Sequence, residues 1–227
     1  MEHLALLQFL QLADSQVPIG SAAHSFGLET LASEGAVTVD DLAHFLEDYL
    51  AEAGARDAAY CRAAHRLVDA PADGFRDAWL TLNQQLSALQ PARESRAAGA
   101  TLGRRFLQLA ANLTGRERLA DALRAAKAAG TDVHHATAFG LVAGALGLSE
   151  DEAALAFLQQ GITALVSAGQ RLMPLGQARA GALLWRLHPG IAQAAAMTDT
   201  EAFTSFTPML DLAAMRHPTL TTRLFIS

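Results

Sequence analysis

The sequence contains a single cysteine, Cys61, among its 227 residues. One thiol excludes an internal disulfide and a cysteine-rich zinc site, and we expect it to be buried and inert. Aromatic residues make up only 6% of the chain although half of it is apolar, so alanine and leucine supply most of the hydrophobicity. Because aromatic and β-branched residues are the usual strand formers, this composition favours helix over strand.

The N-terminus lacks the basic start and apolar stretch of a secretory signal. The longest uncharged apolar run, residues 136–148, is too short and too glycine-rich to span a bilayer, which takes about 20 residues. The formal net charge of −6 argues against a general nucleic-acid binder, which normally carries a basic face. We therefore expect a cytoplasmic protein that binds neither nucleic acid nor membrane.

The familiar motifs of catalysis and metal binding are also missing. Neither glycine-rich phosphate loop is present, and there is no Glu-x-x-His pair or His-Glu-x-x-His motif. His134 and His135 are adjacent, but neighbouring helical positions point about 100° apart, so one ion does not suit both. Ser25 follows His24 without the strand–turn–helix elbow of a serine hydrolase. By elimination, we expect an interaction protein with no catalytic residue, cofactor or metal site.

Apolar residues recur at helical spacing along nearly the whole chain, and turn residues divide it into about ten segments. Strand-like alternation of any length, low-complexity linkers and internal repeats are not evident. The sequence therefore predicts one all-α domain, a multi-helix bundle with no significant sheet. In the first expected helix, Glu2–Ala13, we expect Leu4, Leu7 and Leu10, with Phe9 beside them, to form an apolar stripe along one side.

Several residues indicate where individual helices begin, end or pack closely. Ser149 and Glu152 have the spacing of a capping box at a helix start. His188–Gly190 contains a proline and a glycine, so we expect the preceding helix to end there. Gly140, Gly144 and Gly147 weaken an isolated helix, and we expect close packing against a neighbouring helix to be the reason for them.

The least generic stretch is Pro18–Glu29, called the corner below. Its first residue, a proline, should end the preceding helix. Gly20 permits a left-handed turn, and we expect Ser21 to cap a second helix that carries His24 and Glu29. Taken alone, the stretch is either a plain helical corner or a site that uses these two polar side chains.

Five segments in order resemble the urease accessory protein family UreF, and together they cover almost the whole chain. The corner is the first of them. The others are Leu102–Phe106, His135–Gly140 with Leu146–Gly147, Arg171–Gln177, and an ending that runs from Pro208–Asp211 through His217 to Arg223–Ser227.

This resemblance implies an all-α protein that is usually a homodimer and is not an enzyme. A UreF-like protein would act as a scaffold that assembles with UreD (also called UreH) and with UreG, a nickel-binding GTPase. The assembly would insert nickel into apo-urease, and UreG would carry the nucleotide chemistry.

The resemblance also implies partner-binding residues in the corner and at the C-terminus. They are Gly20, Ser21, His24, Ser25, Glu29, Arg216, His217, Arg223, Leu224 and Phe225. It divides the chain into an all-α domain, residues 1–218, and a tail, residues 219–227, whose order depends on a partner. With Leu224, Phe225 and Ile226 exposed, such a tail would be disordered alone, and docking would offset the cost of ordering it.

Two other hypotheses remain open at this point. One is a helical enzyme or small-molecule-binding protein with a pocket around His24, Glu29 and His135. The other is direct nickel binding by some of the eight histidines.

Overall fold

The computed structural model of the chain describes residues 2–14, 17–198 and 207–227. Within these ranges it contains helices and no strand, which confirms the all-α prediction. The α-helices are α1 (Glu2–Ala13), α2 (Leu28–Ser33), α3 (Leu42–Tyr49), α4 (Ala55–Arg66), α5 (Ala72–Ala88), α6 (Arg93–Thr114), α7 (Glu117–Ala129), α8 (His135–Leu146), α9 (Glu150–Leu172), α10 (Gln177–Ala195) and α11 (Pro208–Arg216). Short helical turns are η1 (Ser21–Ala23), η2 (Leu50–Gly54), η3 (Leu67–Asp69) and η4 (His217–Thr219). No described helix is long and apolar enough to cross a membrane.

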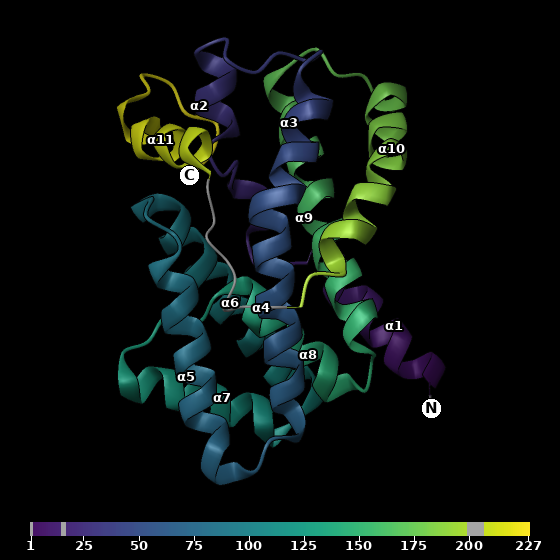
Figure 1. Ribbon diagram of the computed structural model, residues 1–227, viewed down its shortest axis with the longest axis vertical. Helices are drawn as coiled ribbons and strands as arrows, with labels where there is room; N and C mark the ends of the chain where they lie inside the picture. Colours follow the sequence, from purple (N-terminus) through teal and green to yellow (C-terminus); the bar gives the residue numbers. More distant parts are fainter. Residues whose placement is uncertain (1, 15–16, 199–206) are drawn as a thin grey trace.

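Helix α4 runs through the middle of the bundle and packs closely against α8 (Figure 1). Two glycines of α8 make this approach possible. A Cβ at Gly140 would overlap the carbonyl oxygen of Cys61, and one at Gly144 would lie 3.0 Å from that of His65. The predicted close packing is therefore confirmed for Gly140 and Gly144 and wrong for Gly147, which ends α8 in left-handed backbone and whose Cβ would have no neighbour within 4 Å. The Cys61 thiol is buried, and burial raises its pKa, so it remains a protonated and unreactive side chain.

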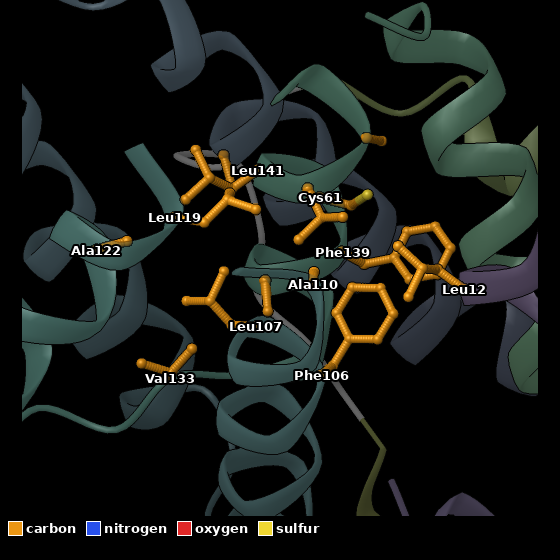
Figure 2. Packing of buried hydrophobic residues seen from close by; sticks show 14 of the residues in the cluster. Leu12, Cys61, Phe106, Leu107, Ala110, Leu119, Ala122, Val133, Phe139 and Leu141 are labelled. Atoms are coloured by element: carbon orange, nitrogen blue, oxygen red, sulfur yellow. The ribbon is translucent and has the colours of Figure 1, made fainter. Parts of the chain in front are cut away.

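An aromatic group fills the core between α1, α6 and α8. The rings of Phe106 and Phe139 stack with their centroids 5.2 Å apart, and Phe9 meets Phe139 edge-on at 5.4 Å. Figure 2 shows Phe106 and Phe139 in the middle of this cluster, with Leu12 from α1 on one side and Leu119 from α7 on the other. A second hydrophobic cluster joins α2, α3, α9, α10 and α11.

The predicted apolar stripe of α1 is wrong for its three leucines. Leu4, Leu7 and Leu10 are exposed, whereas Phe9 is buried together with Leu12. Both sides of this helix are apolar, so hydrophobic spacing alone does not select a face. The ring contacts of Phe9 select it instead.

Of two predicted helix boundaries, one is confirmed and one is wrong. At the start of α9, the backbone N–H of Ser149 donates to Glu152 Oε2 at 2.8 Å, and that of Glu152 donates to Ser149 Oγ at 3.2 Å. By contrast, α10 continues past Pro189 instead of ending there. The segment beyond the proline is packed against α4, where Arg62 Nε donates to the carbonyl oxygen of Ala195 at 2.6 Å. These tertiary contacts offset the usual cost of a proline inside a helix.

Candidate partner-binding site

The corner reverses the chain direction before α2 begins. Gly20 and Gly27 both have φ of +92°, and Phe26 has φ of +51°. The predicted cap at Ser21 is therefore wrong, because α2 has Gly27 as its N-cap and His24 lies in extended backbone. A positive φ is unfavourable for phenylalanine, and such residues persist where the surrounding structure holds them.

The corner is held between α6 and α11. A Cβ at Gly27 would lie 3.1 Å from the carbonyl oxygen of Leu210, so glycine lets α11 approach closely. On the other side, the Arg105 guanidinium donates to the carbonyl oxygen of Ile19 at 3.2 Å. Contacts with two helices therefore fix the shape of the corner.

Glu29, on the first turn of α2, binds the tail. Its side chain is almost fully buried. Oε1 accepts a hydrogen bond from the backbone N–H of Leu224 at 2.5 Å, and Oε2 accepts one from that of Phe225 at 3.2 Å. Oε2 also lies 2.8 Å from His217 Nε2. One buried carboxylate thus fixes two consecutive backbone groups of the tail.

His217 connects α2 to α6 through its two ring nitrogens. The residue is fully buried, and its Nδ1 lies 2.8 Å from Glu94 Oε2, in addition to the contact with Glu29. Each ring nitrogen of this buried side chain therefore faces a carboxylate oxygen, so its polar atoms are paired inside the protein.

The last two residues of the sequence bind the other side of the corner. The backbone N–H of Ile226 donates to the Ala23 carbonyl oxygen at 2.8 Å, and Ser25 Oγ donates to the Ser227 carbonyl oxygen at 3.0 Å. His24 Nδ1 lies 2.7 Å from Ser227 Oγ. Burial, with a smaller effect from Arg105, lowers the pKa of His24, so this ring is neutral near pH 7.

Arg171, at the end of α9, covers the tail from a third direction. Its guanidinium carbon lies 4.1 Å from the centroid of the Phe225 ring, and Nη2 donates to the Leu224 carbonyl oxygen at 3.4 Å. The prediction that Phe225 is exposed is wrong, because only 5% of it is accessible. Leu224 and Ile226 are 56% and 68% exposed, as predicted. The three residues alternate between outside and inside.

The structure brings six of the ten predicted residues together in one connected group, partly through Ser227, and we call this group the corner–tail site. They are His24, Ser25, Glu29, His217, Leu224 and Phe225. Next to this group, Arg216 forms a bidentate ion pair with Glu34, the C-cap residue of α2. Gly20 and Ser21 belong to the corner backbone, and Arg223 is exposed without a side-chain partner among the described residues.

Four contributing residues were not predicted: Glu94, Arg105, Arg171 and Ser227. Arg105, Arg171 and Ser227 fall within segments that carry the family resemblance, so the signal was present but not assigned to the site. Glu94 has no such signal, because only the fold brings α6 next to His217.

Large apolar side chains remain exposed beside this site. Helix α11 exposes Met209, Leu212 and Met215, which are three residues apart and share one face. Leu224 and Ile226 of the tail are exposed as well. Exposed apolar residues that gather on one element are typical of a protein-interaction surface.

The alternative pocket around His24, Glu29 and His135 does not form. His24 and Glu29 bind the tail, whereas the ring of His135 packs edge-on against Phe106 and Phe157, with centroid distances of 5.4 and 5.5 Å. In the described part of the chain, no group of three or more His, Cys, Asp or Glu side chains is arranged to hold a metal ion.

The fold and this site define an all-α protein whose distinctive feature is a polar corner that binds the chain's own C-terminal tail. Comparison with known families agrees with the resemblance seen in the sequence. The family model named UreF matches residues 37–188. The chain belongs to the UreF family of urease accessory proteins.

Three relatives illustrate the similarity, and each carries the name "Urease accessory protein UreF". The protein from Nostoc sp. is 33% identical, and the alignment covers 97% of this chain and 95% of that one. The Paracoccus denitrificans protein is 34% identical over 98% and 96%. The Geobacillus kaustophilus protein is 29% identical over the whole of both chains, so that alignment includes the corner and the tail.

Proposed function

We propose that this chain is a scaffold for urease maturation, which assembles with UreD (UreH) and UreG to insert nickel into apo-urease. The observation that carries the proposal is the corner–tail site, in which buried Glu29 fixes the backbone of a tail whose Leu224 and Ile226 point outward. The family membership supports a role in urease maturation. Nickel is the cargo of this assembly and not a cofactor of the chain.

The tail is the element through which partner binding would act. Its inner side is held by polar groups, so its outer side, with Arg223, Leu224 and Ile226, is available to UreD. Together with the exposed face of α11, these residues would form the surface that then recruits UreG. In this proposal, partner binding further stabilises the position of residues 219–227 that the corner already holds.

The same proposal expects a homodimer that works in the cytoplasm. Light scattering coupled to size-exclusion chromatography tests the first expectation, and fractionation of the producing cells tests the second. A monomer at micromolar concentration would contradict the expected dimer without bearing on the tail.

Binding of purified UreD and UreG from the same organism tests the function directly. We expect Arg223→Ala, and deletion of residues 223–227, to weaken assembly while helical circular dichroism stays unchanged. Arg116→Ala is the matched control, because Arg116 is likewise exposed and without a side-chain partner among the described residues. Absence of binding by the wild type, with urease activity intact after gene deletion, would refute the proposal.

A further inference from the structure

A cavity of about 130 Å³ lies behind the corner, between α4, α6, α8, α9 and α11. Phe26 of the corner forms part of its wall, and Phe157 contributes another aromatic side. Its polar lining includes Gln90, His134 and His135. Neither the proposed function nor the family resemblance assigns a role to this space.

Three buried polar atoms of residues around this cavity have no hydrogen-bond partner among the described residues: His134 Nδ1, His135 Nε2 and Gln90 Oε1. Buried polar groups in native proteins nearly always have a partner, either protein or ordered water. Three such atoms at one cavity therefore require an explanation.

The His134 ring is held firmly with Nδ1 directed at the cavity. Its Nε2 lies 2.6 Å from Ser87 Oγ, and its backbone N–H donates to Asn83 Oδ1 at 2.9 Å. Only 1% of the residue is accessible. Rotation of the ring by 180° would not help, because Nε2 would then lose its contact with Ser87 Oγ and be the unpaired nitrogen instead.

His134 and Gln90 face a common gap at Gly99 of α6. A Cβ built at Gly99 would lie 3.4 Å from His134 Nδ1 and 3.7 Å from Gln90 Oε1. Both unpaired atoms therefore lie within 4 Å of one point beside Gly99. The missing side chain of Gly99 thus leaves room between two unpaired polar atoms.

We infer that this cavity is a water-binding site, in which an ordered water bridges His134 Nδ1 and Gln90 Oε1. The cavity is large enough to hold more than one water. Further waters in it would give His135 a polar neighbour. Water suits the site because it both donates and accepts, as a neutral imidazole and an amide oxygen require.

The charges around the cavity favour a neutral occupant. Burial lowers the pKa of His134, and lowers that of His135 to about 4, so both rings are uncharged near pH 7. Arg56 lines the cavity, and its Nε donates to Asp57 Oδ1 at 2.8 Å. Arg96 lies near His134 and donates to the backbone carbonyl oxygen of Gln90 at 2.6 Å. The carboxylates of Asp57 and Asp211 line the same space, so together with the uncharged rings they favour a neutral occupant over an anion.

Crystal structures of the full-length wild type and of Gly99→Ala, at about 1.5 Å resolution, test the inference. We expect a water within hydrogen-bonding distance of His134 Nδ1 and Gln90 Oε1 in the wild type, and its loss in the variant. An empty gap, or a small organic molecule in place of water, would overturn it.

A pair of glycine variants gives a second measurement that does not need crystals. Gly99 and Gly161 both lie inside helices and line the cavity, but a Cβ at Gly161 would have no neighbour within 4 Å. Alanine there should raise the melting temperature by about 2–4 °C through helix propensity. Gly99→Ala should give no rise, because its methyl group displaces the bridging water. Equal rises in both variants would overturn the inference, and neither outcome depends on UreD or UreG.

Discussion

Replacing Glu29 with glutamine should release the tail while the rest of the fold remains intact. The two side chains have the same shape, so an amide oxygen could still accept the hydrogen bond from Leu224. The amide nitrogen, however, would take the place of Oε2, which accepts from Phe225 and lies 2.8 Å from His217 Nε2. The N–H groups of the new amide would then face the backbone N–H of Phe225 and the ring N–H of His217, so that donors face donors at both contacts.

The size of the effect follows from the two lost contacts. Hydrogen bonds to charged groups contribute about 1.5–3 kcal/mol each, so the closed tail should lose at least about 3 kcal/mol. Since every 1.4 kcal/mol is a tenfold change in an equilibrium constant, tail opening should increase by more than about 100-fold. The free energy of global unfolding should change less, because the freed tail groups bond to water instead of remaining buried and unpaired.

Hydrogen exchange of the backbone amides measures this opening directly. In Glu29→Gln, the Leu224 and Phe225 amides should exchange more than about 100 times faster, while amides of α8 keep their protection. Glu34→Gln is the matched control, since Glu34 directly follows the same helix as its C-cap but bonds to Arg216 at the surface. Unchanged protection at Leu224 and Phe225 would refute the role given to Glu29.

Three further changes have defined outcomes. Burial lowers the pKa of His135 from 6.5 to about 4. The free energy of unfolding should therefore be highest above pH 6.5 and fall by about 3 kcal/mol as the pH drops toward 4. Urea titrations at several pH values check this, and His135→Phe should make the free energy of unfolding less dependent on pH. Gly140→Ala should lower the free energy of unfolding by about 3 kcal/mol or more, or prevent folding, because its methyl group would overlap the Cys61 carbonyl oxygen. Thermal melts of this variant beside those of Gly161→Ala measure the loss of stability. Arg171→Lys, which keeps the charge but loses the planar contact with Phe225, should speed amide exchange of the tail by about 2- to 10-fold, and an unchanged rate would contradict the contact.

The sequence correctly predicted those features of the fold that depend on residues close together in the chain. The capping box at Ser149 involves residues three apart, and the sequence shows both partners together. Pro189 misled the prediction because the segment after it is stabilised by distant residues such as Arg62. In α1, both faces are apolar, so contacts in the core, and not helical spacing, decide that Phe9 is buried and Leu7 is exposed.

The site was predictable as a set of residues but not as an arrangement. The family resemblance pointed to both the corner and the tail, yet Glu29 and Leu224 are 195 positions apart, and no periodicity connects them. Phe225 was expected outside because a short C-terminal segment normally has nothing to cover it. Arg171 and the second hydrophobic cluster provide that cover, and both exist only in the folded chain.

The polar character of the anchor explains how the tail can offer a defined surface. An apolar groove would bind residues 224–226 in more than one register, because all three are large and hydrophobic. Glu29 instead accepts from two consecutive backbone N–H groups, and the Ser25 hydroxyl fixes the position of Ser227. A slip by one residue would break these bonds, bury Leu224 or Ile226 and expose Phe225, because successive side chains of an extended segment point to opposite sides. The buried carboxylate–imidazole network is costly in stability, but it determines which side chains of the tail a partner meets.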